Sequence, residues 1–248
     1  MRPAEHTHST PRGHLLAHGA LFLALLAALP LASAQSFCSS DGQLRPVRLL
    51  ERFINADCEN CWRDPATAKA SPNDAVLDWS VPGSKGDDAP LSAVATRDAL
   101  GRLQALGKSE PSESATSSVA VNPVKGAKLR VAHGVALSGY IGASIELKPV
   151  PAAAKGQRWT SWLALVETVP AGTEGTPVER NLVRNVLQSN WDGRKQLSKE
   201  EQNRFFESRS MSVAQGVNAD QLRVIGWVED AKGRVLVAAQ SVCLAEGK

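Results

Sequence analysis

The sequence predicts an α+β protein, with an N-terminal α/β part followed by a C-terminal β-sandwich. In the first half, apolar runs at 46–54 and 75–79 are typical of buried strands, and an amphipathic helix is predicted at 91–106. From residue 119 onward the pattern changes to short runs of alternating apolar and polar residues, broken by Gly, Pro and Asn. Several such runs in succession favour a sandwich of two sheets.

The N-terminus has the pattern of a secretory signal peptide over residues 1–34. Arg2 and Arg12 precede an uncharged apolar run at 15–31, and the small residues "ASA" follow it. We expect cleavage after Ala34, and the alternative is an uncleaved N-terminal anchor. Because a membrane span needs about 20 apolar residues, this shorter run predicts no stable membrane span after cleavage. The expected location is therefore periplasmic or secreted.

The mature chain has a small net charge and a single histidine. The full chain has a net charge of +3, and residues 1–34 contain two arginines and one glutamate, which leaves +3 − 1 = +2. This near-neutral balance gives no reason to expect nucleic-acid binding. Zinc sites need several His or Cys ligands, and a Ser–His–Asp triad needs a histidine base. Since only His133 remains of five histidines, we expect no metal and no cofactor.

The predicted elements of the N-terminal part follow from local composition. The run at 46–54 is rich in branched and aromatic residues, and the cysteine pair comes just after it. Pro65 can then open a short helix, because proline suits a first helical turn. A loop rich in Pro, Gly and Asp separates the second strand from the helix at 91–106. The segment 107–118 has no large apolar residue, so we expect a mobile loop there.

The C-terminal part is expected to span 136–248, after an N-terminal part at 35–135. Its sharpest signal is a β-hairpin, in which two alternating runs flank the turn residues "DAKG" at 230–233.

Four cysteines, Cys38, Cys58, Cys61 and Cys243, lie in the mature part, where an oxidising compartment lets disulfides persist. An even number fits two bridges with three connectivities, and we favour Cys58–Cys61 with Cys38–Cys243. The second bridge closes a very long loop and contributes about 4 to 5 kcal/mol in the chain-entropy model. The first closes a tiny loop, so its presence calls for a chemical or local explanation.

A strand, then C-x-x-C, then a helix is an arrangement that thiol–disulfide proteins use. Cys58 would lie at the helix start, where free N–H groups stabilise a thiolate, and Cys61 would resolve the mixed disulfide. Asp57 and Glu59 flank the first sulfur and oppose its ionisation. Trp62 follows the second cysteine directly and is expected to line the site and shield the bridge. One metal alternative remains, copper(I) on the two sulfurs with His133 as a third ligand.

The motif "VRLLERFINADCENCW", with the later "LDW", "GYIG" and "GWVEDAKGRVLVAAQ", resembles a secreted bacterial family described as a domain of unknown function. The resemblance implies a thioredoxin-like N-terminal part and a β-rich C-terminal part. Glu51 and Phe53 match the strand that leads to the family's cysteine pair, and Cys58 and Cys61 match the pair itself. The sequence departs from the family at Asp57, at Trp62, and in lacking a proline opposite the sulfurs.

These observations predict an exported envelope protein in which Cys58 and Cys61 are the catalytic residues of a thiol–disulfide oxidoreductase. Its partner would be another envelope protein or a thiol substrate. The alternative is a non-enzymatic binding or assembly module, in which both disulfides are structural and the sandwich carries the contact surface.

Overall fold

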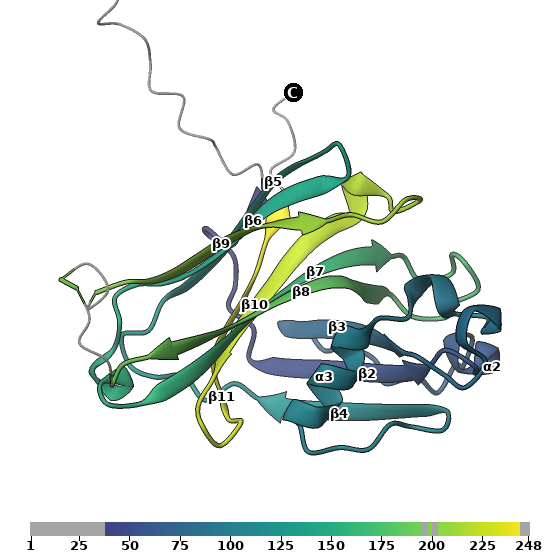
Figure 1. The fold of residues 1–248 in the computed structure, drawn as a ribbon, viewed down its shortest axis with the longest axis horizontal. Helices are drawn as coiled ribbons and strands as arrows, with labels where there is room; N and C mark the ends of the chain where they lie inside the picture. Colours follow the sequence, from purple (N-terminus) through teal and green to yellow (C-terminus); the bar gives the residue numbers. More distant parts are fainter. Residues whose placement is uncertain (1–37, 195–197, 200–202, 244–248) are drawn as a thin grey trace, which may run out of the picture. The chain divides into compact units, whose positions relative to one another are not determined.

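The computed structural model describes residues 38–194, 198–199 and 203–243, and the predicted signal sequence at 1–34 lies outside them. Strands are the commonest elements of the described residues, and they form two sheets (Figure 1). The smaller sheet has, in spatial order, β12 (Val242–Cys243), β1 (Cys38–Ser39), β5 (Leu129–Leu137), β6 (Tyr140–Leu147) and β9 (Phe205–Ser212). The larger sheet has, in order, β11 (Val235–Gln240), β10 (Leu222–Glu229), β7 (Arg158–Val169), β8 (Arg180–Asp192), β3 (Asp74–Val81), β2 (Arg48–Asn55) and β4 (Ser114–Ala120).

Helices are short in the described part of the chain. The α-helices are α2 (Glu59–Trp62) and α3 (Arg97–Ala105). Four 3₁₀ turns accompany them, at η1 (Gly86–Asp88), η2 (Ser92–Val94), η3 (Ala152–Ala154) and η4 (Ala219–Gln221). None of the helices among the described residues is long and apolar enough to cross a membrane.

The prediction of a thioredoxin-like α/β N-terminal part is wrong. Strands β2 and β3 do pair in parallel, but β2 pairs with β4 antiparallel, and the same sheet continues through β8 into long antiparallel strands. A parallel α/β sheet needs helices over both faces, and helices of four and nine residues cannot supply them. A second sheet covers one face instead, so the β-rich, sandwich-like architecture is confirmed.

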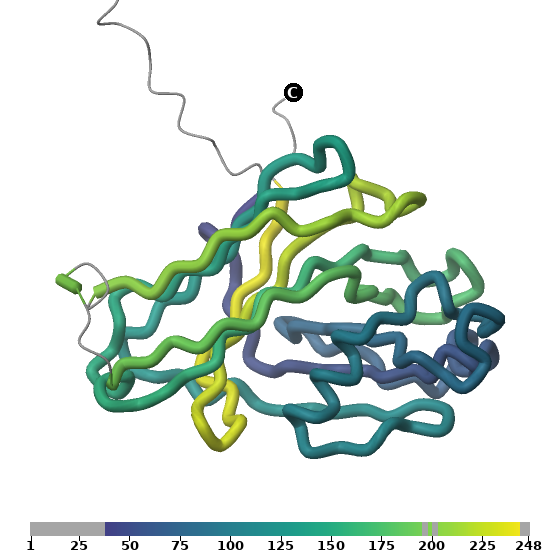
Figure 2. The backbone as a smooth tube through the Cα atoms, in the orientation of Figure 1, coloured from purple at the N-terminus to yellow at the C-terminus, as the bar shows by residue number. Residues whose placement is uncertain are grey.

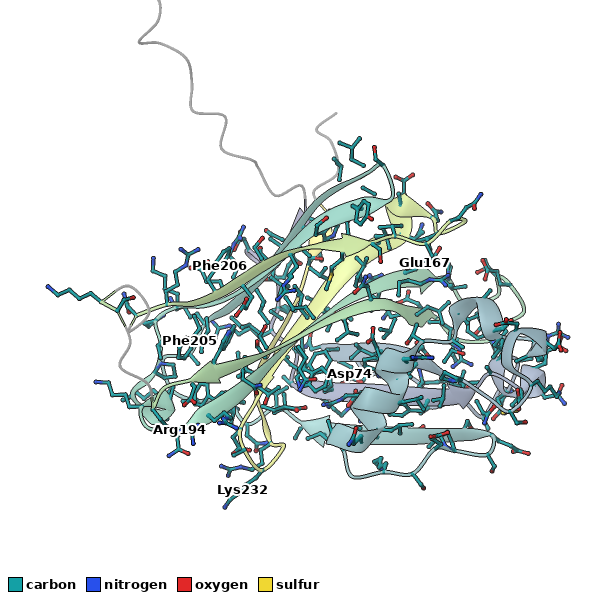
Figure 3. All side chains as sticks on the ribbon, viewed as in Figure 1. Asp74, Glu167, Arg194, Phe205, Phe206 and Lys232 are labelled. Atoms are coloured by element: carbon teal, nitrogen blue, oxygen red, sulfur yellow. A yellow bond between two sulfur atoms is a disulfide. The ribbon has the colours of Figure 1, made fainter. Side chains whose placement is uncertain are left out.

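The core between the two sheets is formed by side chains that alternate along the strands. In β9, Phe205 is buried in this core, whereas its neighbour Phe206 is exposed (Figure 3). The sheets approach closely where Val131 of β5 faces Gly226 of β10. A Cβ atom on Gly226 would lie 2.5 Å from Cγ1 of Val131, so any other residue there would force the Val131 side chain to move. The largest side chains of this core are Trp159, Trp191, Phe205 and Met211.

A second core lies on the opposite face of the larger sheet, under α3 (Figure 1). Helix α3 contributes Ala99 and Leu103 to it, both almost fully buried. Strands β2, β3, β7 and β10 supply most of the rest, including Phe53, Trp79, Trp162, Ile225 and Trp227. Strands β7 and β10 therefore contribute side chains to both cores.

Sequence patterns located the strands on either side of the cysteine pair correctly, as β2 and β3. The helix predicted at 91–106 begins later, at Arg97, and only a 3₁₀ turn precedes it. The physical reason is that the backbone at Ala95 forms a parallel bridge with Ser80 of β3, which holds it extended.

The predicted hairpin at 230–233 is confirmed as the turn between β10 and β11, with Gly233 at a φ of +73°. The predicted loop at 107–118 contains the first residues of β4, an outer strand that pairs with β2 alone. Strand β5 runs through 129–137, across the predicted boundary at 135/136. The backbone trace in Figure 2 shows the first and last described strands, β1 and β12, side by side at one end of the smaller sheet.

Candidate functional site

The cysteine pair lies on a tight turn that leaves the end of β2. Cys58 N–H donates to the carbonyl of Asn55 at 3.0 Å, and Cys61 N–H donates to the carbonyl of Cys58 at 3.2 Å. Cys58 and Cys61 form a disulfide, hereafter the turn bridge, across a sequence separation of 3. Both residues are half-buried, so the turn bridge is neither enclosed in the core nor freely exposed.

Arg180, from the start of β8, holds the carboxyl end of this turn. One of its terminal nitrogens donates to the carbonyls of Trp62 at 3.0 Å and Cys61 at 3.4 Å. Its guanidinium also lies 5.1 Å from the centre of the Trp62 ring, in cation–π geometry. The Trp62 indole N–H donates to the carbonyl of Glu174 at 2.7 Å. Trp62 is thus a buried anchor for the turn, tied to the segment that precedes β8.

Arg180 also belongs to a buried charge cluster, together with Arg52 and Asp78. Asp78 accepts from Arg52 at 2.6 Å and from Arg180 at 3.1 Å, and also from the backbone N–H of Asn181 at 2.7 Å. All three charged side chains are almost fully buried. Burial lowers the pKa of Arg180, and the carboxylate of Asp78 acts in the opposite direction. The cluster joins β2, β3 and β8 directly beneath the cysteine turn.

The two carboxylates beside Cys58 have partners of their own. Asp57 accepts from the backbone N–H and hydroxyl of Ser84, both at 2.8 Å, and from the backbone N–H of Lys85. The hydrogen bond from the Ser84 hydroxyl lowers the pKa of Asp57, so this carboxyl stays ionised. Glu59 pairs with Arg63 at 2.9 Å on the surface. Each of these two negative charges is therefore partly compensated. Asp57 and Glu59 should oppose ionisation of the Cys58 thiol less than their positions beside it in the sequence imply.

The helix start stabilises a Cys58 thiolate less than the sequence predicts. Helix α2 has only four residues, and the Cys58 side chain makes no capping hydrogen bond. Pro65 lies in a turn, so the helix expected there is absent from the described structure. Because a macrodipole builds up from aligned peptide units, one turn of helix stabilises a thiolate only weakly.

The two sulfurs have different surroundings. Cys61 packs against a small apolar cluster that includes Ile54, Trp62 and Leu182, and Cys58 is not a member of it. Cys61 also lines a cavity of about 90 Å³, together with Arg52, Asp64, Thr67, Thr116 and Arg180. The predicted roles, Cys58 attacking and Cys61 resolving, remain predictions, and this asymmetry is compatible with them.

The other favoured bridge, Cys38–Cys243, is also formed and is hereafter the terminal bridge. It joins β1 to β12 with a Cα–Cα distance of 3.9 Å. His133 of β5 is the cross-strand neighbour of Cys38 on the other side. The copper(I) alternative placed His133 beside the turn cysteines, whereas it lies beside Cys38. Its actual neighbours depend on the pairing of β1 with β5, which no local pattern reveals.

A second buried charge cluster, unrecognised in the sequence, lies on the α3 face of the larger sheet. Arg102 of α3 donates to both oxygens of Glu51, at 2.7 and 2.8 Å, and contacts Glu229 at 2.7 Å. The pKa of Arg102 is raised because the two carboxylates outweigh the effect of burial. Three tryptophan indoles donate to the same carboxylates, from Trp79, Trp162 and Trp227. The signal that could have found it is a charge inside an otherwise apolar run, since a buried charge requires partners.

Comparison with known proteins gives little information beyond the fold. No protein-family model matches the chain, and no curated protein is significantly similar to it. Among solved structures, it is similar to HBP35 of Porphyromonas gingivalis, with a TM-score of 0.50 and 11% sequence identity, over 84% of this chain and 78% of that chain. At this identity the likeness concerns the fold alone, and the family resemblance stays a prediction.

Proposed function

We propose that this protein is an exported thiol–disulfide exchange protein whose working disulfide is the turn bridge. The observation that carries the proposal is that buried side chains hold the cysteine turn independently of the sulfur–sulfur bond. Arg180 fixes the carbonyls of Cys61 and Trp62, and the Trp62 indole is bonded to Glu174. The apolar N-terminal run and two disulfides support an extracytoplasmic, periplasmic or secreted location.

The energetics of the turn bridge favour a chemical role over a structural one. In the chain-entropy model, a loop of four residues contributes only about 2 kcal/mol, against about 5 kcal/mol for the loop closed by the terminal bridge. A turn already fixed by Arg180 loses even less freedom when the sulfurs join. Opening the turn bridge therefore leaves its surroundings in place, which is what repeated oxidation and reduction require.

The exchange reaction follows from the two half-buried sulfurs. A thiolate of a reduced substrate attacks Sγ of Cys58, which forms a mixed disulfide and releases Cys61 as a thiolate that takes up a proton. A second substrate thiol then attacks the mixed disulfide, so the substrate is oxidised and Cys58 is reduced. Two electrons and two protons pass from the substrate to the turn bridge. The packing of Cys61 against Ile54 and Trp62 supports Cys58 as the accessible partner.

Thiol trapping in glutathione buffers tests the proposal. The full chain is equilibrated at fixed ratios of reduced to oxidised glutathione, alkylated, and read by peptide mass spectrometry at each cysteine. We expect the turn bridge to have a reduction potential above about −300 mV, so that glutathione buffers reduce it. The terminal bridge should stay oxidised in the same buffers. A turn bridge that remains oxidised well below about −300 mV would identify it as an inert staple.

Single-cysteine variants test the assignment of roles. Cys61→Ser should accumulate a glutathione adduct at Cys58, and Cys58→Ser should accumulate much less at Cys61, because Cys61 is packed. Equal adduct formation in the two variants would contradict the assignment.

A binding module is the second candidate, favoured by exposed apolar residues at the tip of the β5–β6 hairpin. Val135, Leu137 and Tyr140 are 59%, 73% and 56% exposed. Clusters of this kind often mark contact surfaces. An inert turn bridge, together with loss of partner binding in Leu137→Ser, would favour this candidate.

A further inference from the structure

Three potential metal ligands lie side by side in the smaller sheet. Cys38 pairs with Cys243 of β12 on one side and with His133 of β5 on the other. The two sulfurs and one ring nitrogen of His133 all lie within 4.8 Å of one another. The three residues come from strands far apart in the sequence, and strand pairing alone brings them together.

One ring nitrogen of His133 has no hydrogen-bond partner. Its Nδ1 lies 2.8 Å from the carbonyl oxygen of Gly134, and because a carbonyl only accepts, Nδ1 carries the proton. Nε2 therefore holds a free lone pair. That atom is buried without a hydrogen-bond partner, in a residue only 4% exposed. An orphaned buried nitrogen of this tautomer is the form in which histidine binds metals, with its other nitrogen fixed by a carbonyl.

We propose that Cys38, His133 and Cys243 bind a single copper(I) ion when the terminal bridge is reduced. Thiolates are soft ligands that select copper(I), and imidazole also suits copper. Zinc usually takes four ligands, and the described residues bring only three together here, of which Cys38 and His133 are 4% exposed and Cys243 is exposed. The proposal is independent of exchange chemistry at the turn bridge.

The site is closed to metal while the sulfurs are bonded to each other, and reduction opens it. A dithiol reductant gives two electrons and two protons to the terminal bridge and becomes a disulfide itself. Binding of Cu⁺ then displaces both thiol protons and forms two sulfur–copper bonds and one nitrogen–copper bond. Cys243 lies on β12, a two-residue outer strand paired on one side only, so its sulfur can move away from Cys38 to admit the ion.

Copper(I) titration of the full chain tests the proposal. The chain carries Cys58→Ser and Cys61→Ser, so the turn cysteines cannot bind, and is reduced anaerobically with a phosphine that is then removed. Copper(I) is added in competition with bicinchoninate. The matched control carries Cys38→Ser and Cys243→Ser in addition, and it sets the background from the histidines near the N-terminus. We expect one copper(I) per chain above this background, and no excess before reduction.

A His133→Phe variant in the same background should weaken binding at least about tenfold. X-ray absorption of the copper-loaded chain with His133 intact should show one nitrogen and two sulfur ligands, and this reading stands even if His133→Phe fails to fold. Copper(I) binding no stronger than in the control, a ligand shell of sulfur alone, or a clear preference for zinc over copper(I) would each overturn the proposal.

Discussion

Replacing Arg102 by Met should strongly destabilise the protein, because it leaves two buried carboxylates without their counter-ion. Glu51 and Glu229 both contact the Arg102 guanidinium, at 2.7 Å each, and their side chains are 1% and 7% exposed. Methionine fills a similar volume, so the change removes charge and hydrogen bonds more than it removes packing. The same guanidinium also lies about 5 Å from the ring centres of Trp162 and Trp227, at 4.9 and 5.1 Å.

The magnitude follows from burial. Removing one partner of a buried ion pair typically costs about 3 to 5 kcal/mol, since the remaining charge is uncompensated. Three indole N–H groups still donate to the carboxylates, which limits the loss to this range. A domain of ordinary stability has about 5 to 15 kcal/mol in total, so the variant should unfold at a much lower urea concentration.

Urea unfolding followed by tryptophan fluorescence measures the effect, because Trp79, Trp162 and Trp227 surround the cluster. Arg63→Met is the matched control, since Arg63 pairs with Glu59 on the surface, where the side chains are 62% and 55% exposed. Such pairs contribute only about 0 to 1 kcal/mol. Equal losses of stability in the two variants would refute the reasoning.

Three further predictions concern the cysteine turn and the disulfides. Gly83→Ala should displace the Asp57 carboxylate from its hydrogen bonds with Ser84 and so lower the stability, because a Cβ there would lie 2.2 Å from Oδ1 of Asp57; unchanged thermal unfolding would contradict this. Asp57→Asn should be less stable than the wild type at pH 7. The pKa of Asp57 in the folded protein lies below its ordinary value of 3.8. The stability that the Asp57 carboxylate contributes is therefore present above pH 3.8 and is lost as the pH falls through the folded pKa. The unfolding curves of the variant and the wild type should converge in acid and not at neutral pH. Replacing both cysteines of the terminal bridge by Ser should cost about 5 kcal/mol, against about 2 kcal/mol for the turn bridge, and the reverse order in urea unfolding would count against the chain-entropy argument.

Local sequence patterns predicted the elements whose cause is local. Strands β2 and β3 follow from continuous apolar runs, and the β10–β11 hairpin follows from turn residues between alternating runs. The start of α3 could not be predicted, because its position depends on a backbone bridge between Ala95 and Ser80. Strand β4 has a Ser- and Thr-rich sequence without large apolar residues in its first half, and it is ordered as a strand by pairing with β2.

Of the candidate site, only the cysteine pair and its immediate neighbours in the sequence could be predicted. The cysteine pair and its flanking carboxylates are adjacent in sequence, so their proximity was certain. Arg180, which fixes the turn, is 119 residues from Cys61, and no spacing rule connects them. His133 likewise reaches the terminal bridge only through the pairing of β5 with β1. Charges within apolar runs, such as Arg52 and Asp78, were the visible sign that buried partners had to exist.

The sequence around the cysteine motif predicted the two flanking strands correctly and the fold wrongly, and the difference has a physical cause. A strand, a cysteine turn and a second parallel strand do follow one another as β2, α2 and β3. Whether such a unit grows into a helix-covered sheet depends on what is available to bury its faces. Here β7 has apolar residues toward both faces, with Leu163 and Leu165 in one core and Trp162 and Ala164 in the other. A strand of this kind belongs in the middle of a sheet, so β2 and β3 joined the strands that follow them, and a second sheet took the place that helices would have filled.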